Sequence, residues 1–115
     1  MIIEVKGKEF FEQSKKSAKI TVFDFTATWC GPCKQTRPIL EELLIEHEKK
    51  KSDIKFFSID IDEIENKEIT RQFDITAVPT VIFLQNGEFK KGKKFIGSRC
   101  KEDYAKQIDT LLKIK

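Results

Sequence analysis

Two cysteines lie three residues apart where an apolar strand gives way to a helix, within residues 24–34. The preceding run, residues 20–27, is rich in β-branched and aromatic side chains, as in a strand buried on both faces of a sheet. Cys30 and Cys33 would then lie on the first helical turn, where two thiols at this spacing can close a small disulfide ring. When the ring is open, the unpaired N–H groups and the dipole of the helix start favour thiolate over thiol. The pattern predicts reversible thiol–disulfide chemistry.

Strand and helix patterns alternate along the rest of the chain, which we expect to form one domain over residues 1–115. The expected strands cover residues 1–5, 20–27, 54–61, 80–84 and about 93–96. The expected helices cover about 8–16, 31–50, a short segment with Ile69 and Phe73, and a closing segment whose apolar stripe is Tyr104, Ile108, Leu111 and Leu112. The order β-α-β-α-β-α-β-β-α predicts an α/β fold, with a mixed central sheet of about five strands flanked by about four helices.

Charge and composition exclude several classes of protein. Charged residues make up 36% of the chain, but they nearly cancel to a formal net charge of +3, which gives no case for nucleic-acid binding. No apolar run approaches the ~20 residues that a membrane span needs. The N-terminus meets a charge at Glu4, too early for a secretory signal, and three cysteines do not form a secreted disulfide framework. We therefore expect a cytoplasmic protein in a reducing environment.

A zinc site is the main alternative for the cysteine pair. Cys30, Cys33, Cys100 and His47 would supply a complete Cys₃His set. If residues 32–50 form one helix, however, His47 lies about 21 Å from Cys33 along the axis. Since metal ligands must converge on one point, we favour redox chemistry and expect no metal.

Three motifs in order carry a family resemblance. They are Trp29-Cys30-Gly31-Pro32-Cys33-Lys34, the upstream Asp24-Phe25, and Ala77-Val78-Pro79-Thr80. With them the whole chain resembles the thioredoxin family, in the version typical of its cytosolic eukaryotic branch. The resemblance implies the thioredoxin fold and a monomeric electron carrier that reduces protein disulfides and maintains cell redox homeostasis.

The resemblance also implies roles for the residues of the motif. Cys30 would be the attacking nucleophile, and Cys33, one turn deeper and less exposed, would be the resolving thiol. Asp24 would accept the proton of Cys33 during resolution. Gly31 and Pro32 between the cysteines are typical of reductants in this family, whereas oxidants and isomerases tend to carry His in the second place.

A substrate-binding surface is implied as well. In the family a cis peptide bond before the proline of the third motif, here Pro79, exposes the backbone of the preceding residue. Val78 would then pair with an extended substrate segment, and Trp29, Pro32 and Gly97 would complete a flat apolar surface. The redox equivalents would reside in the two sulfurs, with no bound cofactor. Implied partners are an NADPH- and flavin-dependent thioredoxin reductase, peroxiredoxins, ribonucleotide reductase and methionine sulfoxide reductases.

Some positions leave alternatives open. Asp24 could face solvent on a half-exposed strand, although strands of this type are normally covered on both faces, which would raise its pKa by desolvation. Ser58 stands where bacterial relatives carry a lysine thought to tune the buried acid. We interpret Cys100 as a bystander thiol, with glutathionylation or a dimer disulfide as alternatives. The lysines of the hairpin over residues 87–97 could attract partners or could block edge pairing.

Two other functions remain as alternatives. The chain could be a binding module whose dithiol is incidental, although the full set of Asp24, Cys30, Cys33 and Pro79 argues for catalysis. A disulfide isomerase is disfavoured by Gly31 and Pro32 and by the absent signal and retention sequences.

Overall fold

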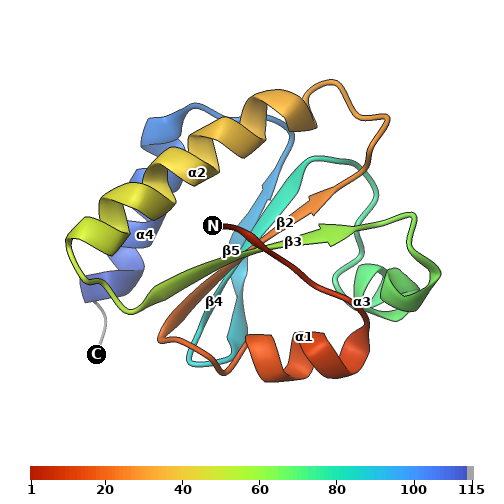
Figure 1. Cartoon of the computed structure of the whole chain (residues 1–115), viewed down its shortest axis with the longest axis horizontal. Coiled ribbons are helices and arrows are strands. Elements are labelled where there is room, and N and C mark those ends of the chain that lie inside the picture. Colours follow the sequence, from red (N-terminus) through yellow and green to blue (C-terminus); the bar gives the residue numbers. More distant parts are fainter. Residues whose placement is uncertain (114–115) are drawn as a thin grey trace.

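The computed structural model describes residues 1–113, and within residues 90–93 it describes only the backbone. The elements follow the predicted order (Figure 1). They are β1 (Ile3–Glu4), α1 (Lys8–Ser14), β2 (Ile20–Thr26), α2 (Cys33–Lys49), β3 (Ile54–Asp60), the 3₁₀ turn η1 (Ile64–Asn66), α3 (Lys67–Gln72), β4 (Thr80–Gln85), β5 (Glu88–Ile96) and α4 (Lys101–Lys113). The predicted α/β fold is confirmed.

The sheet is mixed, with the strand order β1-β3-β2-β4-β5. β2 is central and runs parallel to β3, whereas it pairs antiparallel with β4. Because β2 and β3 are parallel, their carboxyl ends lie at the same edge of the sheet. The β2–α2 connection with both cysteines therefore lies beside the segment that follows β3.

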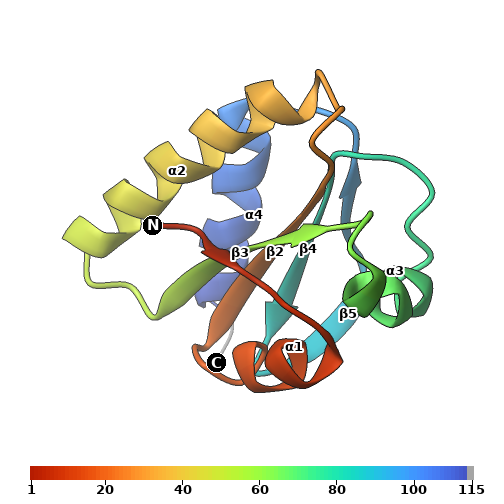
Figure 2. The ribbon, with the colours of Figure 1, turned by 45° about the vertical axis from the view of Figure 1, so that its right-hand side comes forward.

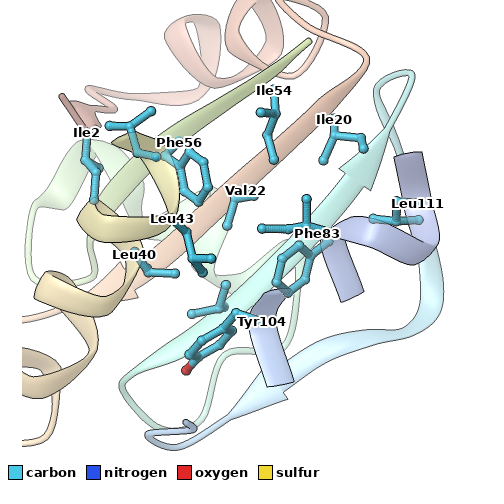
Figure 3. Packing of buried hydrophobic residues seen from close by; sticks show 13 residues of the cluster. Ile2, Ile20, Val22, Leu40, Leu43, Ile54, Phe56, Phe83, Tyr104 and Leu111 are labelled. Atoms are coloured by element: carbon cyan, nitrogen blue, oxygen red, sulfur yellow. The ribbon is translucent and has the colours of Figure 1, made fainter. Parts of the chain in front are cut away.

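Helices cover both faces of the sheet, α2 and α4 on one side and α1 and α3 on the other (Figures 1 and 2). The alternation of side chains along a strand sends Ile20 and Val22 of β2 toward α2 and α4. Figure 3 shows this cluster, in which Leu40 and Leu43 of α2 and Tyr104 of α4 meet the sheet. We call it the α2/α4 face.

The opposite side of β2 supplies aromatic packing, and we call it the α1/α3 face. Phe23 stacks on Phe57 of β3 with ring centroids 5.0 Å apart, and Phe11 of α1 lies 4.9 Å from Phe23. Phe25 and Ile69 of α3 complete the contact. β2 is thus buried on both faces, as its sequence predicts.

α2 begins at the cysteines and extends along the whole sheet. Its residues Leu40, Leu43 and Leu44 are buried, which confirms the predicted apolar stripe, while Ile39 is half-buried. Among the helices that the structure describes, none is both long and apolar enough to cross a lipid bilayer.

The start of β5 corrects one prediction, because the strand begins at Glu88 rather than near Lys93. The segment Lys90-Lys91-Gly92-Lys93 has no apolar residue, but an edge strand is held by its backbone ladder and needs no buried side chain there. Between the pairs Ile82–Lys94 and Leu84–Phe89, β4 advances by two residues and β5 by five. The bulge contains the extra hairpin residues. The predictions that the hairpin lysines attract partners or block edge pairing fall partly on Lys90, Lys91 and Lys93, whose side chains lie outside the described part.

Candidate functional site: a dithiol at the start of α2

The connection between β2 and α2 sets the position of both cysteines. The Cys30 N–H donates to the Ala27 carbonyl at 3.2 Å, which folds the chain back after the strand. The first helical bond reaching back four residues runs from the Thr36 N–H to the Pro32 carbonyl at 3.2 Å. The helix therefore begins at Cys33, two residues later than predicted, with Pro32 as its cap. Pro32 suits this position because its missing N–H would have no helical partner.

Cys30 and Cys33 are joined by a disulfide, with their Cα atoms 5.4 Å apart. The Cys33 N–H, one of the unpaired donors of the helix start, points at the Cys30 sulfur at 3.2 Å. This donor and the helix dipole would stabilise negative charge on Cys30 in the reduced protein. The two residues are equally buried, at 3% and 4% exposure, so the expectation that Cys33 is less exposed is wrong for this disulfide form.

Asp24 lies in the middle of β2 and is only 1% exposed, so the half-exposed alternative is wrong. It belongs to the same strand face as Val22 and points toward α2. Its Oδ1 accepts no hydrogen bond from the described residues. Burial raises the pKa of this carboxyl to about 7, and the positive charge of Arg37 opposes the rise. Ser58 pairs with Asp24 in register on β3 and offers no charge to replace a lysine.

The residues predicted to bind substrate gather around the disulfide. Trp29 is 67% exposed, and Pro32 is exposed beside it. Val78 is half-buried and packs against the buried cluster formed by Ala27 and the two cysteines. We call Trp29, Pro32, Val78 and Gly97 the substrate face.

Backbone geometry brings the last two segments of this surface together. The Val78–Pro79 peptide bond is cis. The Gly97 N–H donates to the Pro79 carbonyl at 2.8 Å, and Gly97 has a φ of +83°, which favours glycine. Gly31 and Lys34, the other motif residues, are exposed, and a side chain at Gly31 would meet nothing within 4 Å.

Sequence reasoning missed three neighbours of the dithiol. The Trp29 indole Nε1 donates to the Asp62 carboxylate at 2.6 Å, and Ile61 packs against the cysteine cluster. Both follow β3, whose end adjoins the end of β2, so parallel pairing of these strands was the available signal. Arg37, one turn after Cys33, carries the charge that acts on Asp24.

The alternative zinc ligands do not converge. His47 lies in the last turn of α2, where its Nδ1 is 3.0 Å from the Ser52 hydroxyl. Within residues 1–113, leaving aside the side chains of 90–93, no three His, Cys, Asp or Glu side chains form a group able to hold a metal ion. Cys100 is a free, exposed thiol before α4.

Comparisons with known proteins agree with this geometry. The thioredoxin family model matches residues 1–110. Thioredoxin of Staphylococcus aureus is 34% identical over 108 residues, which cover 94% of this chain and 95% of that protein. The oxidized form of mitochondrial thioredoxin 3 from Saccharomyces cerevisiae superimposes with a TM-score of 0.81 at 30% identity, covering 95% of this chain and 94% of that one.

A further relative is a much longer protein with two activities in its name. The bifunctional thioredoxin reductase/thioredoxin of Mycobacterium leprae is 36% identical over 99 residues, which are 86% of this chain but only 20% of that protein. Members of the matched family are disulfide oxidoreductases, and the Cys30–Cys33 pair supplies the same thiol–disulfide redox chemistry here. This chain belongs to the thioredoxin family.

Proposed function

We propose that the chain is a protein-disulfide reductase and electron carrier, with Cys30 as nucleophile, Cys33 as resolving thiol and Asp24 as proton acceptor. The observation that supports it most is the Cys30–Cys33 disulfide at the start of α2, directly against the half-buried Val78 of the substrate face.

The reaction starts from the reduced protein. The Cys30 thiolate attacks one sulfur of a substrate disulfide, and the other substrate sulfur leaves as a thiolate that takes a proton from water. Cys33 gives its proton to the Asp24 carboxylate and attacks Cys30 in the mixed disulfide. The substrate's second sulfur leaves, and the protein holds the Cys30–Cys33 disulfide after losing two electrons. A pKa of about 7 suits Asp24 to accept and release this proton near neutrality.

Substrate binding needs a surface rather than a pocket. Exposed Trp29 and Pro32 offer apolar contact, and Val78 offers backbone groups to an extended segment. Such a shallow surface suits a protein that reduces many partners. By family resemblance the expected substrates are peroxiredoxins, ribonucleotide reductase and methionine sulfoxide reductases.

Recycling requires an outside reductant. We propose an NADPH- and flavin-dependent thioredoxin reductase, in keeping with the Mycobacterium leprae relative that unites a reductase and a thioredoxin. The chain itself would need no bound cofactor, since two sulfurs hold the two electrons. We further propose that it works in the cytoplasm, because an exposed free thiol such as Cys100 persists best in a reducing compartment.

The first test is the reduction of insulin by dithiothreitol with catalytic amounts of the protein. Wild type should accelerate the reaction, and Cys30→Ser should abolish the acceleration. The matched control is Cys100→Ser, which removes a thiol outside the site and should leave the rate unchanged. Failure of folded wild type to accelerate the reaction would refute the reductase and favour a binding module.

Trapping separates the roles of the two cysteines. Cys33→Ser should accumulate a mixed disulfide between Cys30 and a model disulfide peptide, visible by mass spectrometry. Cys30→Ser should accumulate none, since the nucleophile is missing. Equal trapping by both variants would contradict the assignment.

A further inference from the structure

Arg37 lies on α2 and belongs to none of the three sequence motifs. Arg37 lies one helical turn beyond Cys33, so the two side chains project from the same side of α2. A recess of about 220 Å³ opens beside them. It is lined by Thr26, Ala27, Thr28, Cys33, Lys34 and Arg37.

Thr26, in the wall of the recess, belongs to the same strand as the buried acid. Thr26 and Asp24 are two residues apart on β2, so both point to the α2/α4 face. Asp24 is 1% exposed, and its Oδ1 has no partner among the described residues. The recess thus reaches the strand face to which this carboxyl points, and Arg37 forms part of its wall.

Among the residues whose side chains the structure describes, Arg37 on α2 is the cation whose charge acts on Asp24. On α4 lies the buried Tyr104; burial raises the pKa of this phenol, and the charge of Asp24 raises it further. The in-register neighbours of Asp24, Ser58 on β3 and Val81 on β4, carry no charge. Arg37 is itself near one acid, Glu41, with Nε 3.6 Å from Oε1.

We propose that Arg37 is a positioning residue for proton transfer at Asp24, holding the carboxylate form ready for Cys33 and marking the recess through which the proton then leaves to water. This inference rests on the proposed function and names a residue that adjusts the same site. The Cys33 proton passes to Asp24, Cys33 sulfur bonds to Cys30, the substrate thiolate leaves, and the Asp24 proton goes to solvent water. No further oxidant or reductant is needed.

The test removes the charge of Arg37 while keeping much of its length. Arg37→Gln should raise the titration midpoint of Asp24 by about half a pH unit, the size expected for a partly exposed charge near a buried acid. The midpoint is read from the ¹³C chemical shift of the Asp24 carboxyl in the oxidised protein, assigned with Asp24→Asn.

The pH profile of single-turnover disulfide reduction, followed by the fluorescence of the single tryptophan beside Cys30, should shift equally. Near pH 7 the rate should fall roughly twofold and recover above pH 8.5.

Two variants complete the design. Arg37→Lys should restore the wild-type midpoint, because it keeps the positive charge. Arg71→Gln, the same substitution at an exposed position of α3 on the other side of the sheet, should change neither readout. An unchanged Asp24 midpoint in Arg37→Gln would overturn the inference even in an active protein. If wild type does not accelerate the reduction of insulin, the proposed function is refuted. The titration of the Asp24 carboxyl would still show whether Arg37 acts on it.

Discussion

The same strands form both faces of the central sheet, but the two faces carry different kinds of side chain. On the α1/α3 face, β2 contributes Phe23 and Phe25 to an aromatic cluster. On the α2/α4 face, the same strand contributes Asp24, and α2 contributes His47. Among the described residues, these two are the buried side chains of the acidic and basic types, so proton-linked behaviour is concentrated on one side. By alternating its side chains, a single strand thus keeps its titrating group apart from its aromatic packing.

The largest expected effect is on the aromatic side. Phe23→Ala should lower the free energy of unfolding by about 3–5 kcal/mol, because a fully buried ring between Phe11 and Phe57 is replaced by a cavity. Urea denaturation of the oxidised protein measures it. Phe23→Leu fills most of the space, so its free energy of unfolding should fall by clearly less. The pH profile of disulfide reduction should keep its midpoint in Phe23→Leu; a shifted midpoint would show that the two faces are not separate.

Asp24 should make the stability of the protein depend on pH. Its pKa is raised from 3.8 to about 7 on folding, so the folded protein holds a proton that the unfolded chain releases. The contribution of Asp24 to stability is therefore greatest below pH 4, falls between pH 4 and 7, and by pH 8 has lost up to about 4 kcal/mol. Asp24→Asn should remove this slope and be more stable than wild type at pH 8, while resolving mixed disulfides more slowly.

Denaturation curves between pH 4.5 and 8.5 measure the slope. Ser58→Ala, at the neighbouring position, removes no titrating group and serves as the control. A wild-type stability that is flat or rises over this range would contradict the assigned titration of Asp24.

A smaller effect is expected at Tyr104. Its hydroxyl accepts the Arg99 N–H at 3.3 Å, which ties the segment before α4 to the α2/α4 face. Tyr104→Phe should cost about 1 kcal/mol, the usual value of one such hydrogen bond. The ring contact with Phe95, with centroids 5.8 Å apart, should remain. A loss as large as that of Phe23→Ala would show that this face depends on its polar contacts as much as on its packing.

The smallest effect is expected at His47. Burial lowers its pKa from 6.5, and nearby Lys50 lowers it further, so folding favours the neutral ring over the charged one. Stability from this group is present above pH 6.5 and is lost as the pH falls, opposite in sign to the effect of Asp24. Comparing Asp24→Asn with Asp24→Asn/His47→Gln isolates it. The double variant should lose less stability between pH 7 and 5; equal losses would exclude His47 as the source.

Much of this arrangement could be predicted from local sequence. The burial of Asp24 followed from its position between Phe23 and Phe25, since such a strand is covered on both faces. The order of strands and helices followed from periodicity, and the cysteine spacing indicated the redox pair. These features depend on near neighbours in the chain.

Other features depend on which distant segments meet. Trp29 and Asp62 are 33 residues apart and come together because β2 and β3 are parallel. The equal burial of the cysteines depends on packing by Ile61 and Val78. Arg37 looks like an ordinary surface residue until the side of the sheet that α2 covers is known.

The short span of the disulfide has a consequence for the whole molecule. Cys30 and Cys33 are separated by three positions, so the bond restricts the unfolded chain very little. In the chain-entropy description, a ring this small stabilises a fold by about 2 kcal/mol, against about 4.7 kcal/mol for a ring of 100 residues. We therefore expect the reduced protein to keep the same architecture. Reduction and reoxidation of the cysteine pair would then not require the chain to unfold.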